Sequence, residues 1–203
     1  MEMINLNNVE PSKPLNQDFE LIPVGTIARA SMMLKLGDIE IPEFGSGAWF
    51  KKSFSSNAKW CEIEFTVIGG EFDKRKFWQK IFIDGDALAS NGMSKARQIG
   101  LSTLRTIIDS AKALNPSDTS SEAQNARNLS GIAQLNTLEL CVKIGIEKGT
   151  NGYADRNKMM AALSPDHSDY ISGNGSVQAA PSTQGATPET PPNNGVLPQW
   201  ANR

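Results

Sequence analysis

Residues 74–82 read Lys-Arg-Lys-Phe-Trp-Gln-Lys-Ile-Phe, and this stretch decides the fold. In a β-strand, successive side chains point to opposite faces of the sheet. One face then carries cations and aromatic rings: Lys74, Lys76, Trp78, Lys80 and Phe82. The other face is largely apolar and suits a core: Arg75, Phe77, Gln79, Ile81 and Ile83. The alternation predicts a strand with one exposed face and one buried face.

The predicted exposed face combines two chemical features that seldom occur together on a solvated strand. Lysine side chains neutralise phosphates, and aromatic rings stack on unpaired bases. Turning the strand over would place Trp78 in the core, but it would also bury Lys76 and Lys80 at a high cost in free energy. We therefore expect Trp78 to be exposed on a face that suits single-stranded nucleic acid.

The segment before this strand completes a predicted β-hairpin. Residues 59–68 alternate between an apolar face and a face that carries Trp60, Glu62 and Glu64. Gly69-Gly70 begins the turn into the strand at residues 74–84, as expected for a short hairpin loop. The two glutamates would repel phosphate, which counts against a continuous binding face.

The other elements follow in an order that is typical of a small β-barrel. The expected elements are a strand at 25–36, the hairpin, a helix at 94–114 with Ser94 as its N-cap, a weaker helix at 121–129, and strands at 138–147 and 157–163. Three strands, a helix and two strands form the element order of an OB-fold, a five-stranded Greek-key barrel. The expected fold class is therefore mainly β: an OB-fold-like barrel with its helix between strands 3 and 4.

Residues 37–58 form a long polar connection, and such connections are usually functional. Residues 48–54 in its middle read Ala-Trp-Phe-Lys-Lys-Ser-Phe. In one interpretation, Trp49 and Phe50 fold back and cover one end of the barrel. In the other, the loop is a finger whose rings stack on bases. OB-folds use the loop between their first two strands for oligonucleotides, which favours the finger.

Composition divides the chain into a central domain and two tails. The 203 residues carry a net charge of −2. Residues 23–165 form the predicted domain, which is mildly basic, since 18 Lys and Arg against 15 Asp and Glu give +3 up to residue 163. Residues 1–22 form a predicted mobile arm. Residues 166–203 have too little apolar surface to offset the entropy of ordering, and we expect a disordered tail.

The sequence offers little support for chemistry other than binding. Cys61 and Cys141 lie in apolar runs and are expected to be buried, reduced thiols. The chain has one histidine, His167, and no metal site is predicted. It has no Gly-rich phosphate loop, no Cys–His pair and no acid cluster with metal-ligand spacing, so no cofactor or catalytic residue is predicted. The N-terminus lacks the basic region of a signal peptide, and no apolar run approaches the ~20 residues of a membrane span. We expect a cytoplasmic protein.

Residues 64–78 resemble a motif of phage and prophage proteins. They read Glu-Phe-Thr-Val-Ile-Gly-Gly-Glu-Phe-Asp-Lys-Arg-Lys-Phe-Trp: an apolar strand, a Gly-x-aromatic turn and an Arg-Lys-apolar-aromatic run. This pattern is similar to that of small OB-fold, single-stranded-DNA-binding-like proteins encoded beside replication and recombination genes. Residues 102–114 resemble the helix of that family, and residues 144–159 resemble its closing hairpin. Lys74 departs from the pattern, which has glycine before the Arg-Lys pair.

The resemblance implies a protein that coats and protects single-stranded DNA during phage replication or recombination, in the host cytoplasm and without an enzymatic step. The alternative is a protein-interaction module of the same complexes, with its aromatic rings at a partner or dimer interface. The predicted nucleic-acid contacts are Trp49, Phe50, Lys51, Lys52, Lys74, Arg75, Lys76, Trp78, Lys80, Tyr153 and Arg156. In the tail, Leu197 and Trp200 are predicted to bind a replication or recombination protein. The sequence leaves the oligomeric state open.

Overall fold

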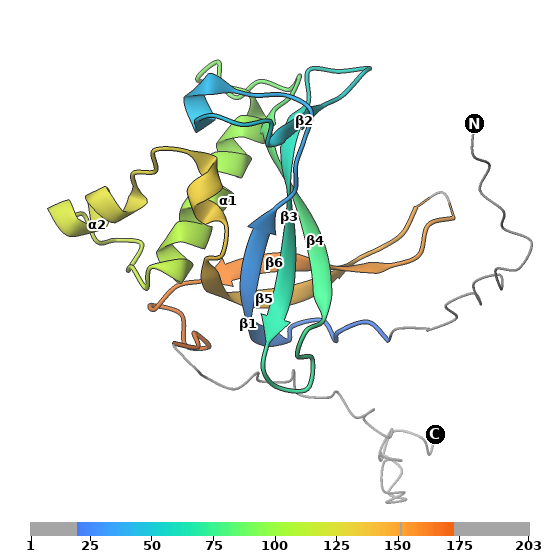
Figure 1. The fold of residues 1–203 in the computed structure, drawn as a ribbon, viewed down its shortest axis with the longest axis vertical. Coiled ribbons are helices and arrows are strands. Elements are labelled where there is room, and N and C mark those ends of the chain that lie inside the picture. The colour runs from blue at the N-terminus through green and yellow to red at the C-terminus, as the bar shows by residue number, and fades with distance from the viewer. Residues whose placement is uncertain (1–19, 151, 173–203) are drawn as a thin grey trace, which may run out of the picture.

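Strand β3 (Lys59–Ile68) lies at the centre of an antiparallel sheet in the computed structural model, which describes residues 20–150 and 152–172. One edge of β3 pairs with β1 (Ile27–Leu34), and the other edge pairs with β4 (Lys76–Asp84). Three strands complete the sheet: β2 (Phe50–Lys52) beside β3, β5 (Glu139–Glu147) beside β1, and β6 (Arg156–Leu163) beside β5. Within the described residues, β4 and β6 are in contact but share no hydrogen-bonded register, so the sheet is open (Figure 1).

Helices lie on one side of this sheet (Figure 1). Helix α1 (Lys95–Ala111) follows Ser94, whose hydroxyl accepts a hydrogen bond from the Arg97 N–H at 3.3 Å, so the predicted N-cap is confirmed. The shorter helix α2 (Ser121–Arg127) occupies the weaker predicted stretch. Two 3-10 helices that we did not predict are present at Pro42–Phe44 and Ile132–Leu135.

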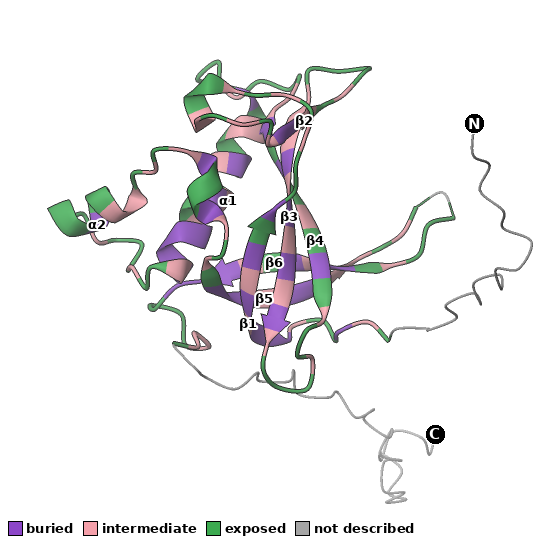
Figure 2. Cartoon of the chain, in the orientation of Figure 1, coloured by how far each residue is buried: buried purple, intermediate pink, exposed green. Residues whose placement is uncertain are grey.

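The hydrophobic core lies between α1 and the inner face of the sheet. Figure 2 shows buried and less buried residues alternating along β3 and β4. Phe65 and Phe77, which are cross-strand partners, stack with their ring centroids 5.1 Å apart. Phe77, Ile81 and Ile83 point inward, as the alternation predicts, and Trp78 is on the exposed side. The predicted orientation of this strand is therefore confirmed.

Helix α1 approaches the backbone of β4 most closely at Gly100. A Cβ atom at this position would lie 1.9 Å from the carbonyl oxygen of Phe82. Any larger residue at Gly100 would therefore force α1 and β4 apart. The glycine allows two backbones to be in direct contact behind the exposed face of β4.

The turn of the β3–β4 hairpin differs from the prediction at Lys74. Strand β4 begins at Lys76, and Lys74 lies in the turn with φ of 64°. This is the left-handed region that glycine adopts most readily. A glycine would adopt this conformation without strain, and Lys74 adopts it here. Lys74 therefore does not share the alternation of the strand that follows it.

The domain extends further at its N-terminal end than predicted. Ile22, which we assigned to the mobile arm, is fully buried. Its backbone N–H donates to the side-chain oxygen of Asn157 at 2.9 Å, and its carbonyl accepts from the Asn157 amide at 2.8 Å. Residues 20–22 therefore belong to the domain, while residues 1–19 lie outside the described part of the chain.

The C-terminal boundary also lies beyond the predicted position. Tyr170 and Ile171, which we assigned to the disordered tail, pack against a cluster of Ile27, Cys141 and Leu163. The Tyr170 hydroxyl donates to the backbone carbonyl of Ser110 at 3.2 Å. Residues 166–172 therefore continue the domain. The predicted partner contacts Leu197 and Trp200 lie outside the described residues.

The two cysteines are free and buried, as predicted. Burial raises the pKa of the Cys61 thiol to about 12, so the thiol stays protonated at neutral pH. In the described ranges, no group of His, Cys, Asp and Glu side chains is arranged to hold a metal ion. No described helix is long and apolar enough to span a membrane.

Candidate nucleic-acid interface

The exposed side of β4 carries Lys76, Trp78, Lys80 and Phe82, which we call the β4 outer face. These side chains alternate with the buried residues of the strand and point away from the core. Trp78 is 44% exposed, so its ring is accessible from solvent. The β4 outer face therefore presents two aromatic rings and two lysines in alternation along one strand.

The neighbouring strand places acidic and aromatic side chains beside this face. In the antiparallel register, Glu64 is opposite Trp78, Glu62 is opposite Lys80, and Trp60 is opposite Phe82. The rings of Trp60 and Phe82 lie 5.7 Å apart, and the Lys80 ammonium lies 5.1 Å from the Trp60 ring centroid. This distance is typical of a cation–π interaction. The end of the face near Phe82 is therefore an aromatic pair with an adjacent cation.

Glu64 lies at the centre of a hydrogen-bonded cluster on the same side of the sheet. Its carboxylate accepts from Lys76 Nζ at 2.7 Å, from Trp78 Nε1 at 3.2 Å and from Lys35 Nζ at 3.4 Å. The hydrogen bond from Lys76 lowers the pKa of Glu64 below its usual value, so the side chain is ionised at neutral pH. The Lys76 ammonium is therefore already paired with a carboxylate within the protein.

A groove runs beside the start of β4 and links it to the β5–β6 hairpin. It has a volume of about 590 Å³ and is lined by Leu21, by residues 74–78 and by residues 154–157. The groove brings Arg156 together with four predicted contacts that are distant from it in sequence: Lys74, Arg75, Lys76 and Trp78. Tyr153 is exposed and lines an adjoining cavity that also includes Arg156.

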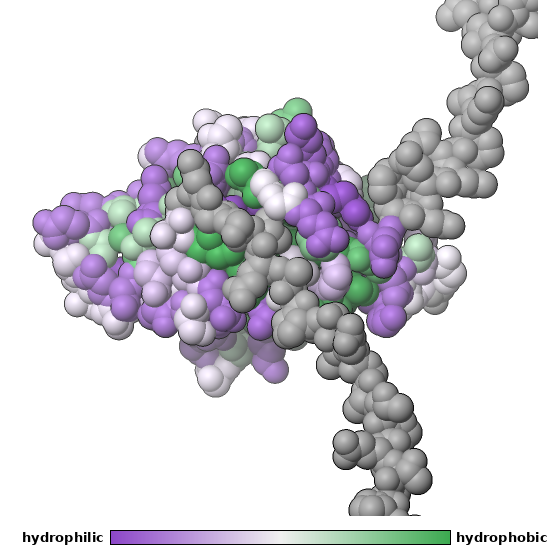
Figure 3. All heavy atoms as spheres, turned by 90° about the horizontal axis from the view of Figure 1, so that it is seen from below, coloured by the Kyte–Doolittle hydropathy of each residue, from purple (hydrophilic) through white to green (hydrophobic). Residues whose placement is uncertain are grey.

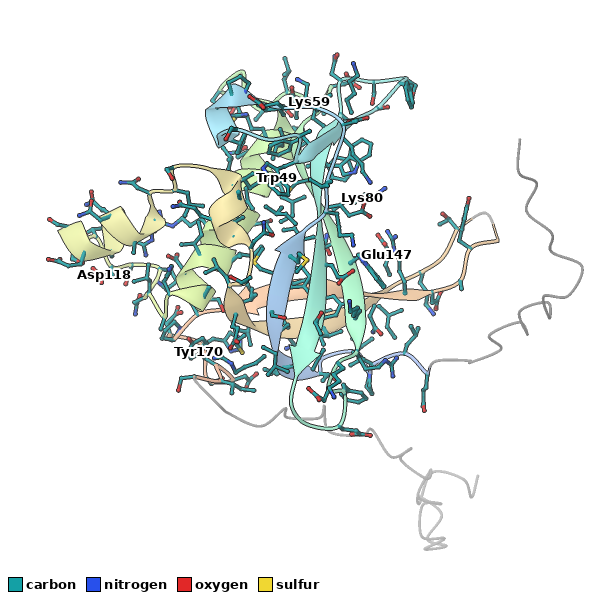
Figure 4. The ribbon with its side chains drawn as sticks, viewed as in Figure 1. Trp49, Lys59, Lys80, Asp118, Glu147 and Tyr170 are labelled. Atoms are coloured by element: carbon teal, nitrogen blue, oxygen red, sulfur yellow. The ribbon has the colours of Figure 1, made fainter. Side chains whose placement is uncertain are left out.

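Two projections border the exposed side of β4. Figure 1 shows the β2–β3 loop at the top of the view and the β5–β6 hairpin extending to the right of β4. In Figure 4, Lys80 and Glu147 lie on this same side, with Lys80 nearer the β2–β3 loop. In the view from below, hydrophobic areas are interspersed with hydrophilic ones (Figure 3). The exposed side of β4 therefore lies between two projecting segments, the β2–β3 loop and the β5–β6 hairpin.

Ion pairs divide the predicted phosphate contacts into two groups. Lys51 pairs with Glu62 at 2.9 Å, Lys76 with Glu64 at 2.7 Å, and Arg156 with Glu147 at 2.5 Å. Arg75 donates to the backbone carbonyl of Glu20 at 2.6 Å. Among the described residues, Lys52, Lys74 and Lys80 have no carboxylate within 4.0 Å. These three cations can bind a phosphate without first breaking an ion pair within the protein.

The prediction that Phe50 stacks on bases is wrong for this conformation. Phe50 is 0% exposed and packs in the core, where its ring lies 5.1 Å from that of Phe44. Its strand β2 is short but pairs with β3, and this pairing directs the ring inward. Of the two interpretations of the loop, the one in which it covers the end of the sheet therefore holds for Phe50.

Trp49 is also displaced from the predicted surface. Its side chain is partly buried against the core, and Nε1 donates to the Ser46 carbonyl at 3.1 Å. Figure 4 shows it towards the helices, whereas Lys80 lies on the far side of β4. Trp49 is therefore not part of the β4 outer face.

Three side chains of this surface were missing from the predicted contacts. Phe82 belongs to the alternation of β4, and the parity of the strand was sufficient to include it. Phe54 is fully exposed in the β2–β3 loop, two residues after Lys52. Lys35 reaches Glu64 from the residue after β1, a contact that only the register of β1 on β3 reveals.

Comparison with protein-family models and with curated proteins finds no match to this chain.

Proposed function

We propose that this protein binds single-stranded DNA along the β4 outer face and coats the strand during phage replication or recombination. The observation that carries the proposal is the exposed alternation of Lys76, Trp78, Lys80 and Phe82 beside a groove that also includes Arg156. Bases would stack on Trp78 and Phe82, and phosphates would bind the lysines that have no carboxylate partner, such as Lys80. No covalent step is proposed.

The architecture supports an OB-fold assignment as part of this proposal. The order of the long strands and the position of α1 between β4 and β5 match that fold. In this assignment, β4 and β6 are the two strands between which the barrel remains open. The β2–β3 loop and the β5–β6 hairpin then correspond to the loops that border oligonucleotides on OB-folds.

The runner-up function is a protein-interaction surface that uses the same aromatic rings. Interfaces are also rich in tryptophan, but their cores are depleted of charged residues. On the β4 outer face, lysines alternate with the rings. This composition favours a polyanion over a protein partner.

We expect binding of oligo-dT to weaken with salt in proportion to the number of phosphates neutralised. For single strands, log K falls against log salt by about 0.7 per phosphate. The three lysines without a carboxylate partner, Lys52, Lys74 and Lys80, give an expected slope of about −2. Fluorescence anisotropy of a labelled oligo-dT at several salt concentrations measures this slope.

The variant Lys80→Gln and its control Lys112→Gln test the location of the site. Lys112 is exposed at the end of α1, away from β4. Lys80→Gln should make the slope less negative by about 0.7, whereas Lys112→Gln should leave it unchanged. Absence of binding by the wild-type protein at low salt would rule out the proposed function. Equal effects of the two variants would argue that the site lies elsewhere.

A further inference from the structure

The donors around Glu64 form an arrangement that would suit a phosphate. Two ammonium groups and one indole N–H, from Lys35, Lys76 and Trp78, converge on one carboxylate. They come from two different strand regions, on either side of β3. Charge-assisted hydrogen bonds from lysines are also the contacts by which proteins bind phosphate oxygens. The Glu64 carboxylate therefore has the position that a bound anion would have.

We infer that Glu64 occupies a latent phosphodiester site at the centre of the sheet and thereby keeps the phosphates of a bound strand away from this position. The inference rests on the proposed function, because it assumes that a single strand crosses the β4 outer face. Glu64 is fixed in place by its three donors, and its side chain is only 12% exposed. A phosphate near it would meet a second negative charge and would find both lysines already paired.

This arrangement determines which part of the strand lies over the centre of the sheet. Two of the lysines without acidic partners lie on either side of the cluster along the hairpin: Lys74 in the β3–β4 turn and Lys80 further along β4. Phosphates would follow these cations. The bases would then lie over Trp78, whose ring is oriented by its hydrogen bond to Glu64. In this arrangement Glu64 is a positioning residue.

The variant Glu64→Gln tests the inference because it removes the charge and keeps the shape. With Lys35 and Lys76 released, one more phosphate can bind. We expect the affinity for oligo-dT at low salt to rise roughly tenfold, the size of one charge-assisted contact. The slope of log K against log salt should become more negative by about 0.7. A purely structural role of Glu64 would not steepen this slope.

Two control variants separate charge from geometry. Glu122→Gln removes the same charge from the exposed surface of α2, far from the sheet, and should change the affinity less than twofold. Glu64→Asp keeps the charge and withdraws the carboxylate by one methylene, and it should not gain affinity. Thermal melting of each variant verifies that the comparison is made on folded protein.

The outcomes distinguish this inference from the proposed function. If the wild type binds and Glu64→Gln binds with equal or lower affinity, the latent site is wrong. An equal gain in Glu64→Asp would also overturn it, because the effect would then come from repacking. If the wild type does not bind but Glu64→Gln does, the proposed function fails and the inhibitory role of Glu64 is supported.

Discussion

Replacing Phe50 with alanine should lower the free energy of unfolding by about 3–5 kcal/mol, the usual cost of truncating a fully buried phenylalanine. The ring has no exposed surface and packs against Phe44, so the substitution leaves a cavity at the end of the core. Urea denaturation of the variant and of the wild type measures the difference. Oligo-dT affinity, measured well below the unfolding transition, should stay close to the wild-type value.

Phe54→Ala is the matched control, because it removes the same ring four residues away, in the loop that follows β2. Phe54 is fully exposed, so its truncation should change the free energy of unfolding by less than about 0.5 kcal/mol. If Phe50→Ala instead retained its stability and lost affinity for oligo-dT, the ring would act on bases after all. The burial of Phe50 would then not describe the protein in solution.

Trp78→Ala should weaken oligo-dT binding by about 1–3 kcal/mol, the range found for stacking of a base on an aromatic side chain. This corresponds to a loss of affinity of roughly 5- to 150-fold. The fold should lose less, about 1 kcal/mol, because the ring is half-exposed and its hydrogen bond to Glu64 is at the surface. Anisotropy of a labelled oligo-dT gives the affinity, and thermal melting gives the stability.

Ile99→Ala is the control for Trp78→Ala. Ile99 is a large exposed apolar residue on α1, on the opposite side of the sheet from the β4 outer face. Its truncation should leave both binding and stability nearly unchanged. A Trp78→Ala variant that melts far below the wild type with unaltered affinity would contradict the stacking role and would favour a structural role for the indole.

The orientation of β4 could be predicted because the opposite orientation of the strand carries a large cost in free energy. Burying Lys76 and Lys80 would have required two buried ammonium groups, so the alternation had one acceptable solution. Ser94 likewise identified the start of α1 by its local chemistry. These features depend on residues that are close in sequence.

Phe50 could not be placed in the same way, because its orientation depends on distant partners. A Trp-Phe-Lys-Lys run is compatible with either face until β2 pairs with β3 and Ile39 bridges to Phe50. The boundaries of the domain were missed for the same reason. The partner of Ile22 is Asn157, and that of Tyr170 is Ser110, so neither contact leaves a signal in the local sequence.

The ion pairs were the least predictable part of the site. Their partners depend on side-chain reach as well as on register, as the contact from Lys35 to Glu64 shows. The number of lysines and arginines in the sequence therefore overstates how many cations are available to a ligand. Of the predicted lysine contacts, Lys51 and Lys76 are already compensated within the protein.

The direct contact between α1 and β4 at Gly100 has a consequence for the thermodynamics of ligand binding. Because a helix backbone supports β4 from behind, this strand has little freedom left to lose when a ligand arrives. The entropic cost of association would fall on side chains such as Lys80 and Trp78, at about 0.5–1.5 kcal/mol for each one immobilised. The surface would thus be preorganised, and the β4 backbone should move by less than about 1 Å between the free and the bound protein.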